Sequence, residues 1–216
     1  MTPSSPSSRR VVIWRHGQTA WNAERRFQGQ LDVDLDDLGR AQAARAGRLL
    51  AGLSPSAIIA SDLLRARTTA EALASLTGLS VATDKRLREI DVGFWQGLTF
   101  DEVSARFPEE AAEWSDGGEG RRGGGESLVE VGERVFAAVT DALVSLPADG
   151  VLIVATHGAA GRALAASLIG LPTTSWRALG SLANCSWSIV RETERGWRLA
   201  EHNAGTLPEP VVGDDQ

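Results

Sequence analysis

The chain has few of the residues from which disulfides and transition-metal sites are built. Its 216 residues include one cysteine, Cys185, so no disulfide can form within the chain and a reducing compartment is expected. The three histidines, His16, His157 and His202, together with that cysteine offer no spacing typical of a zinc site. We therefore assign no metal ligands, which leaves only carboxylate-rich sites for hard metals open.

Long apolar runs and an excess of positive charge are also absent. The first ten residues, MTPSSPSSRR, are followed by only four strongly apolar residues, too few for a signal peptide or a membrane span. The net charge of -6 argues against nucleic-acid binding, although a few clustered arginines can still make a positive pocket for an anionic small molecule. We expect a cytoplasmic protein whose partner is a small molecule, not a nucleic acid or a membrane.

The length suits one α/β domain or two small ones. Residues 10–203 show no internal repeat and no break in composition, which favours a single domain. We expect residues 1–9, rich in serine and proline, to form a disordered arm and residues 204–216 to form a flexible tail.

Short apolar segments alternate with helical patterns along the chain. The expected strands are Val11–Trp14, Ala57–Ala60, Val81–Thr83 and Val151–Thr156, followed by a terminal hairpin of 186–190 and 197–200. Helical patterns cover residues 35–53, 63–76, 127–146 and 158–169, and another over 100–114 is broken by Pro108. This order predicts a three-layer α/β/α sandwich with a mostly parallel central sheet and one antiparallel strand.

Charged and polar residues lie at the ends of these expected strands. In open α/β sheets, ligands bind outside the carboxyl ends of the strands, and parallel strands bring those ends to one edge. The residues found there are Arg15 and His16 with Gly17, Arg65 at the start of the second helix, Glu89 in the loop LREIDVGFWQG, and His157 with Gly158.

Two histidines, two arginines and one carboxylate suit phosphate-monoester chemistry. Guanidinium groups match the charge on the phosphoryl oxygens, and an imidazole can attack phosphorus as a covalent nucleophile. A carboxylic acid can protonate the leaving alkoxide and then, as carboxylate, activate water. The glycine after each histidine, Gly17 and Gly158, would let the backbone approach the phosphate. No cofactor or metal is required, because arginines and imidazole supply the positive charge.

Other features have simpler interpretations. The Gly-rich segment DGGEGRRGGGE, residues 116–126, lacks the GxxxxGK[ST] pattern and follows no strand, so it is not a P-loop. His202, near the end of the last strand, is expected to be structural or exposed. Each site residue taken alone is equally compatible with a structural role, and only their joint placement indicates a site.

The motifs as a set resemble the histidine phosphatase superfamily, the phosphoglycerate-mutase-like fold. IWRHGQTAWN is similar to the family signature, and SDLLRARTTA, LREIDVGFWQGLTF, GGES and VATHG match later blocks in the same order, over roughly residues 10 to 200. The resemblance implies an α/β/α sandwich and also suggests a homodimer.

The resemblance also implies roles for individual residues. His16 would become transiently phosphorylated, and Glu89 would be the proton donor. Arg15, Arg65 and His157 would hold the phosphate. Asn22 falls on a phosphate-pocket position, and Gln28 and Gly29 match the block that closes over the substrate.

Within the family, the block LREIDVGFWQGLT resembles the phosphatase branch and not the mutases, which carry a motif like LNERHYG. WRALGSLANCSW is similar to a segment of actinobacterial glucosyl-3-phosphoglycerate phosphatases. The expected function is therefore a metal-independent phosphatase, a phosphoric monoester hydrolase acting on a small phosphorylated metabolite. A phosphoglycerate-type mutase and a non-catalytic module that binds a phosphorylated ligand are the alternatives.

Overall fold

The computed structural model describes residues 8–118 and 120–205. The arm predicted for residues 1–9 and the tail predicted for 204–216 lie outside these ranges, apart from residues 8, 9, 204 and 205. Arg9 is described, and its guanidinium donates to both carboxylate oxygens of Glu192, at 2.6 and 2.7 Å. The prediction of a single domain over residues 10–203 stays a prediction.

Six strands form one sheet in the order β3-β2-β4-β1-β5-β6. Their bounds are β1 (Arg10–Arg15), β2 (Ala57–Ala60), β3 (Val81–Thr83), β4 (Val151–Thr156), β5 (Trp187–Thr193) and β6 (Gly196–Ala204). β1 to β4 pair in parallel, whereas β5 runs antiparallel to both of its neighbours, β1 and β6. The predicted sheet, mostly parallel with one antiparallel strand, is confirmed.

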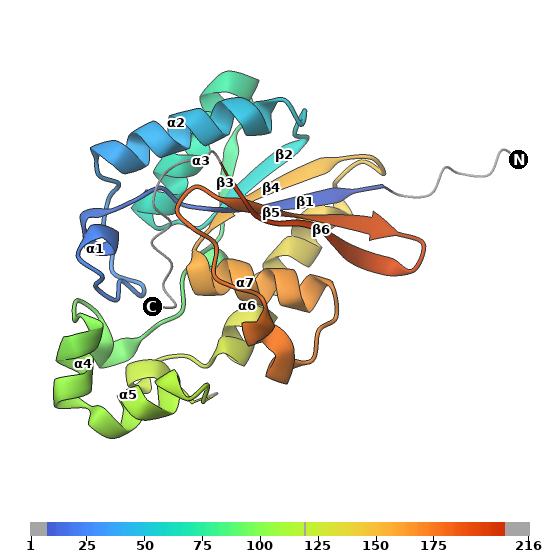
Figure 1. The fold of residues 1–216 in the computed structure, drawn as a ribbon. Coiled ribbons are helices and arrows are strands. Elements are labelled where there is room, and N and C mark those ends of the chain that lie inside the picture. Colours follow the sequence, from blue (N-terminus) through green and yellow to red (C-terminus); the bar gives the residue numbers. More distant parts are fainter. Residues whose placement is uncertain (1–7, 119, 206–216) are drawn as a thin grey trace, which may run out of the picture.

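Helices cover both faces of the sheet (Figure 1). Because side chains alternate along a strand, Val12 and Trp14 of β1 pack with α2 (Asp37–Ala51) and α3 (Leu64–Thr77). Val11 and Ile13 pack on the other face with α6 (Leu128–Val144) and α7 (Gly158–Leu168). The predicted three-layer α/β/α sandwich is confirmed.

The four long helices occupy the predicted segments, and their ends have local causes. Asp36 caps α2, Ser127 starts α6 with a capping box, and Gly78 ends α3 in the left-handed conformation. Short elements were not predicted: α1 (Ala20–Ala23), η1 (Lys85–Leu87), η2 (Gly93–Trp95), η3 (Arg122–Gly124) and η4 (Thr173–Ala178). Within the described part of the chain, no helix has the length and apolar character needed to cross a membrane.

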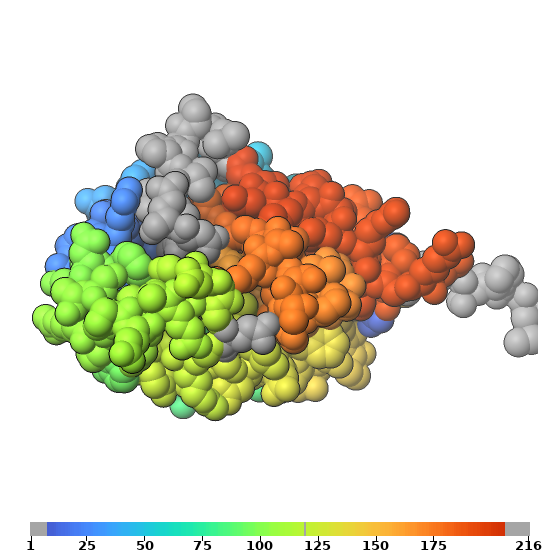
Figure 2. Space-filling view, turned by 60° about the horizontal axis from the view of Figure 1, so that its bottom comes forward, coloured from blue at the N-terminus to red at the C-terminus, as the bar shows by residue number. Residues whose placement is uncertain are grey.

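Two helices stand apart from the three layers, beside α1 (Figure 1). They are α4 (Phe100–Arg106) and α5 (Pro108–Ser115), separated by Phe107 where Pro108 breaks the helical pattern, as the sequence predicted. In the space-filling view these helices form the green end of the molecule (Figure 2). Both helices lie beyond the carboxyl end of the sheet, over the segments that follow its strands (Figure 1).

The register of the two central strands places the predicted site residues together. Arg15 of β1 lies opposite Thr156 of β4, so the next residue of each strand, His16 and His157, leaves the sheet at the same edge. The His16 N–H donates to the Thr156 carbonyl at 3.0 Å and extends this pairing by one step.

The turn after β1 is packed tightly against the first turn of α2. A Cβ on Gly17 would lie 2.3 Å from the Gly39 carbonyl oxygen, and a Cβ on Gly39 would lie 2.0 Å from the Gln18 carbonyl oxygen. Gly17 is therefore needed for contact with a helix, and the prediction that it lets the backbone approach a phosphate stays a prediction.

We expect Gly39→Ala to lower the free energy of unfolding by about 1–3 kcal/mol, because the added methyl group would displace the backbone at Gln18. Gly180→Ala is the matched control, since a Cβ at Gly180 meets no atom within 4 Å. Urea unfolding of both variants tests this. Equal stability of the two variants would contradict the tight packing of α2 against the turn after β1.

Candidate active site

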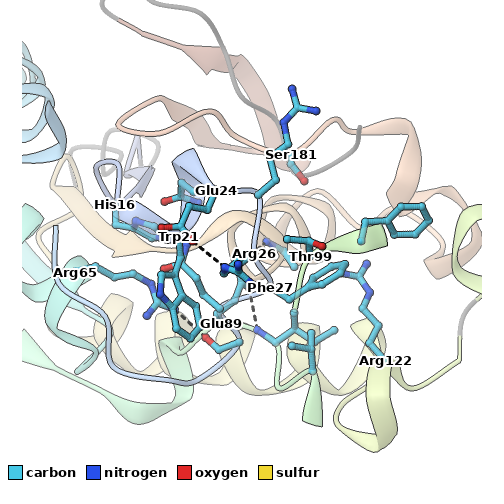
Figure 3. A pocket seen from close by; sticks show the side chains of 18 of the residues that line it. His16, Trp21, Glu24, Arg26, Phe27, Arg65, Glu89, Thr99, Arg122 and Ser181 are labelled. Atoms are coloured by element: carbon cyan, nitrogen blue, oxygen red, sulfur yellow. Dashed lines mark hydrogen bonds and ion pairs between the residues drawn. The ribbon is translucent and has the colours of Figure 1, made fainter. Parts of the chain in front are cut away.

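A cavity of about 400 Å³ opens at the carboxyl edge of the sheet, between β1, α1, α3, α7 and the pair α4 and α5. In Figure 3, His16 and Arg65 lie at one end of the cavity and Arg122 lies at the other. Seven of the nine predicted site residues line it: Arg15, His16, Asn22, Gln28, Gly29, Arg65 and Glu89. The other two, His157 and Gly158, are buried directly behind this surface.

The two histidines form a close pair. The ring centroids of His16 and His157 are 5.1 Å apart, with an angle of 62° between the ring planes. Both side chains are buried, and neither ring nitrogen of His157 has a hydrogen-bond partner among the described residues. A buried imidazole in this state is suited to donate to a ligand beside His16.

One hydrogen bond fixes the orientation of the His16 ring. His16 Nδ1 lies 2.7 Å from the carbonyl oxygen of Gly17. A carbonyl can only accept, so Nδ1 carries the proton and the lone pair of the neutral ring is on Nε2. The His16 carbonyl accepts from the Cys185 N–H at 3.1 Å and from Asn184 Nδ2 at 3.2 Å, which holds the backbone of the nucleophile candidate.

Burial keeps both rings neutral. It lowers the pKa of His16 well below the usual 6.5, and the positive charges of Arg65 and Arg15 lower it further. The pKa of His157 is lowered in the same way, first by burial and then by Arg65, His16 and Arg15. A neutral imidazole is the form that can act as a nucleophile.

Backbone carbonyls hold the two arginines that accompany His16. Arg15 Nη1 donates to the Leu182 carbonyl at 2.6 Å. Arg65 donates through Nη1 to Leu31 and through Nη2 to Gly29, both at 2.8 Å. Backbone carbonyls orient these guanidinium groups, and their positive charge makes the inner end of the cavity suited to an anion.

The carboxylate of Glu89 is fixed at the start of α7. Its Oε1 accepts from the backbone N–H groups of Ala160 at 3.0 Å and Ile90 at 2.9 Å, and Oε2 accepts from Ala159 at 3.2 Å. The start of α7 therefore holds a carboxylate of the protein.

The main chain of Glu89 is held from behind by Arg134. Arg134 donates to the carbonyls of Arg86, Arg88 and Glu89 at 2.6–2.9 Å and to both carboxylate oxygens of Glu126 at 2.8 Å. Glu126 belongs to the GGES block, and its Oε2 also accepts from the Asp91 N–H at 2.8 Å. This block therefore positions the loop that carries Glu89.

The Gly-rich segment packs against the same loop. A Cβ on Gly123 would lie 2.2 Å from the Val92 carbonyl oxygen, and one on Gly125 would lie 2.1 Å from the Asp91 carbonyl oxygen. Only glycine permits this approach of two backbones. As a result, the neighbouring Arg122 lines the cavity with its guanidinium 5.4 Å from the ring centroid of Trp114.

The remaining predicted residues contribute in different ways. Asn22 accepts from Thr19 and from Asn184 Nδ2, which ties α1 to the loop before β5. Gly29 lines the cavity with its backbone, and its carbonyl holds Arg65. Gln28 is buried in the lining. Gly158 is the first residue of α7 and does not itself line the cavity.

Sequence reasoning missed part of the lining. Arg162 and Ser181 line the cavity, and the guanidinium of Arg162 donates to the hydroxyl of Ser181. An aromatic wall of Trp21, Phe27, Phe100 and Trp114 completes it. Arg162 follows Ala159 by three residues, so helical spacing could have placed both on one face, but the Ala-rich sequence indicated only a core helix.

Two further expectations concern histidine and metals. His202 is structural, because its Nε2 donates to the Gly180 carbonyl at 2.9 Å and its Nδ1 accepts from Ser188 Oγ at 2.8 Å. Within residues 8–118 and 120–205, no cluster of three or more His, Cys, Asp or Glu side chains is arranged to hold a metal ion.

Curated relatives are similar to this chain over most of its length. A glucosyl-3-phosphoglycerate phosphatase of Mycolicibacterium vanbaalenii is 43% identical over 185 residues, which cover 83% of this chain and 82% of the relative. A probable phosphoglycerate mutase of Erwinia tasmaniensis is 40% identical over 188 residues, which cover 87% of this chain and 86% of the relative.

A solved structure is also similar to this chain, in both fold and sequence. The structure of a mycobacterial glucosyl-3-phosphoglycerate phosphatase in complex with VO3 matches with a TM-score of 0.85 and 39% sequence identity, over 91% of this chain and 100% of that chain. The family model described as histidine phosphatase superfamily (branch 1) matches residues 11–205. The chain therefore belongs to the histidine phosphatase superfamily.

Proposed function

We propose that the protein is a metal-independent phosphatase that hydrolyses a small phosphorylated metabolite through a phosphohistidine on His16. The observation that carries the proposal is the buried, neutral His16 ring, whose Nδ1–H donates to Gly17 and whose Nε2 is left as the nucleophile. Membership of the histidine phosphatase superfamily supports the same chemistry.

The proposed phosphate site consists of Arg15, Arg65 and His157 around His16. Backbone carbonyls orient the two guanidinium groups, and His157 offers a ring N–H. These groups match the three phosphoryl oxygens, on which negative charge stays throughout the transfer. A metal is not needed in this scheme, since the protein's own cations neutralise the phosphate.

The proposed reaction has two steps. His16 Nε2 forms a bond to phosphorus as the ester P–O bond breaks, and Glu89 gives its proton to the departing oxygen, which leaves as an alcohol. Water then attacks the phosphohistidine, its proton passes to the Glu89 carboxylate, the P–N bond breaks and inorganic phosphate is released. Glu89 is suited to both steps because three backbone N–H groups hold its carboxylate at the cavity wall.

Glucosyl-3-phosphoglycerate is the substrate that we place first. The relative from Mycolicibacterium vanbaalenii is named for it, and the cavity of about 400 Å³ has room beyond the phosphate. Cytoplasmic location belongs to the same proposal and is supported by the single cysteine, Cys185. The predicted homodimer stays a prediction.

A second function, phosphoglycerate mutase, is favoured by one observation. The relative from Erwinia tasmaniensis, at 40% identity, is named as a probable phosphoglycerate mutase. A mutase would return the phosphoryl group from His16 to another oxygen of the substrate, whereas a phosphatase passes it to water. A non-catalytic binding module is the third alternative, and the presence of both His16 and Glu89 in the cavity speaks against it.

The nucleophile can be identified by trapping the phosphorylated form of the enzyme. After a quench of turnover with radiolabelled substrate, we expect an acid-labile, base-stable label on His16, unaffected by EDTA. His16→Ala should abolish the label and turnover and leave the fold intact, whereas His202→Gln should keep the label because, among the described residues, His202 bonds to Ser188 and Gly180. Substantial turnover by His16→Ala would rule out the mechanism.

The rate of His16 phosphorylation should fall at acid pH. His16 attacks as the neutral ring, and its pKa is lowered, so the rate should fall only below pH 6.5. Glu89→Gln removes the proton donor and should slow this step. Single-turnover kinetics measure both effects. An acid limb centred above pH 6.5 would contradict the neutral, buried state of His16.

Phosphatase and mutase are separated by the fate of 3-phosphoglycerate. We expect release of inorganic phosphate and no isomerisation to 2-phosphoglycerate, because the proposed Glu89 step delivers the phosphoryl group to water. Product analysis by ³¹P NMR measures both fates in one sample. Isomerisation faster than phosphate release would favour the mutase, and no reaction with a broad panel of esters would favour the binding module.

A further inference from the structure

The peptide group between Glu89 and Ile90 connects the proposed proton donor to side chains outside the cavity. Its N–H donates to the Glu89 carboxylate, at 2.9 Å from Oε1. Its carbonyl accepts two hydrogen bonds, from Arg134 Nη2 at 2.9 Å and from Gln30 Nε2 at 3.2 Å. A peptide group is planar, so donors that fix the direction of its carbonyl also fix the direction of its N–H. The two side chains therefore orient one of the three N–H groups that hold the carboxylate.

Arg134 is wholly engaged in holding the segment that leads to this peptide group. Its guanidinium makes five hydrogen bonds, one from each N–H, at 2.6–2.9 Å. Three go to the carbonyls of Arg86, Arg88 and Glu89, and two go to the carboxylate of Glu126. Arg134 does not line the cavity. Its contribution to the reaction must therefore pass through the main chain of Glu89.

Gln30 connects the same peptide group to the phosphate end of the cavity. The carbonyls of the residues on either side of it, Gly29 and Leu31, both accept from the Arg65 guanidinium at 2.8 Å. The side-chain amide of Gln30 then donates to the Glu89 carbonyl. Residues 29–31 thus form a short link from a guanidinium of the proposed phosphate site to the main chain of the proposed proton donor.

The reaction requires a fixed distance between the phosphate and the acid. A proton donor must lie within hydrogen-bond distance of the oxygen that departs, and a misplacement of about 1 Å can lower a rate about 100-fold. Arg65 belongs to α3, whereas the Glu89 carboxylate is held by the start of α7 and by the Ile90 N–H. Gln30 connects these two parts of the site directly.

We propose that Arg134 and Gln30 are positioning residues. Through the peptide group of Glu89 and Ile90, they hold the carboxylic acid of Glu89 at the distance from the phosphate that protonation of the departing oxygen requires. Neither side chain lines the cavity, so both act through Glu89. This inference rests on the proposed function and adds to it the residues that place its proton donor.

Two phosphate esters separate the positioning of the acid from a general structural effect. The alkoxide that leaves 3-phosphoglycerate must be protonated, whereas p-nitrophenolate leaves p-nitrophenyl phosphate as a stable anion. A misplaced proton donor therefore slows the phosphorylation of His16 by the first ester and has little effect with the second. Quenched-flow kinetics of a single turnover measure this step apart from the hydrolysis of the phosphohistidine, in which Glu89 also takes part.

Arg134→Lys is the main variant, because it loses the planar fork and keeps a positive charge, which also helps to lower the pKa of His157. We expect phosphorylation by 3-phosphoglycerate to slow about 10–100-fold, part of the full effect of a proton donor, and phosphorylation by p-nitrophenyl phosphate to change less than about threefold. The inhibition constant of inorganic phosphate should also change less than about threefold, because the phosphate site keeps all its residues.

Gln30→Met is the second variant and answers the case in which Arg134→Lys does not fold. Methionine keeps the length of the side chain and loses the amide, and the backbone N–H of residue 30 can still donate to Gln96 Oε1, as it does at 2.8 Å. Phosphorylation by 3-phosphoglycerate should slow about 3–10-fold, the effect of one hydrogen bond, and phosphorylation by p-nitrophenyl phosphate should be unchanged.

Arg9→Lys is the matched control. Arg9 makes the same kind of forked pair, with both carboxylate oxygens of Glu192 at 2.6 and 2.7 Å, and it also donates to a backbone carbonyl. Its side chain is 25% exposed, close to the 18% of Arg134, but it lies at the opposite end of β1 from His16. Arg9→Lys should leave both phosphorylation rates unchanged.

The outcomes separate this proposal from the proposed function. Glu89→Gln should slow phosphorylation by 3-phosphoglycerate more than either variant does. If it does so, and Arg134→Lys and Gln30→Met slow both esters equally or neither, the positioning role is overturned. If Glu89→Gln slows both esters equally, or the wild type hydrolyses neither, the proposed function fails, and amide hydrogen exchange at Ile90 becomes the readout. Faster exchange in Arg134→Lys than in Arg9→Lys would support the positioning of Glu89, and equal exchange would overturn it.

Discussion

The parallel pairing of β1 with β4 is the constraint on which the rest of the site depends. Its register sets Arg15 opposite Thr156, so the next residues, His16 and His157, must leave the sheet side by side. Neighbouring strands are about 4.8 Å apart, and the two imidazole centroids are 5.1 Å apart, close to that spacing. The sheet, buried on both faces, therefore sets the separation of the two rings before any ligand is present.

The same burial determines the chemical state of the rings. Removal from water and the nearby guanidinium charges both lower the pKa of His16 and of His157, so the uncharged forms persist. The positive charge of the site is then supplied by its arginines, because guanidinium groups are always charged in proteins. In the proposed mechanism, the site thus separates two roles that one charged histidine could not combine: arginines would attract the phosphate, and a neutral imidazole would attack it.

The sequence predicted the positions of those site residues that come directly after the end of a strand. The apolar segments before Arg15 and His157 marked two buried strands, and the parallel-sheet rule placed the following residues together, although they are far apart in sequence. Glu89 was found with them, but its anchoring by the N–H groups of Ile90 and of two residues in the first turn of α7 was not, because backbone N–H groups leave no mark in the sequence.

Other features of the site could not be predicted from the sequence, because they depend on how neighbouring segments pack. Arg162 stands in an Ala-rich helix whose orientation about its axis is set by packing, so its face toward the cavity could not be predicted. The contact of Gly17 with Gly39 could not be predicted, because it depends on how α2 packs. The contact of the Gly-rich segment with the loop that carries Glu89 could not be predicted either, because it depends on how two backbones pack together.

The central claim is that, without ligand, His16 is a neutral ring with its proton on Nδ1 and its lone pair on Nε2. A long-range ¹H–¹⁵N correlation spectrum of the protein labelled at histidine tests it directly, and with three histidines in the chain His16→Gln assigns the signal. At pH 7 and without ligand, we predict a neutral His16 ring in the Nδ1–H tautomer. An imidazolium, or a neutral ring protonated on Nε2, would contradict the account.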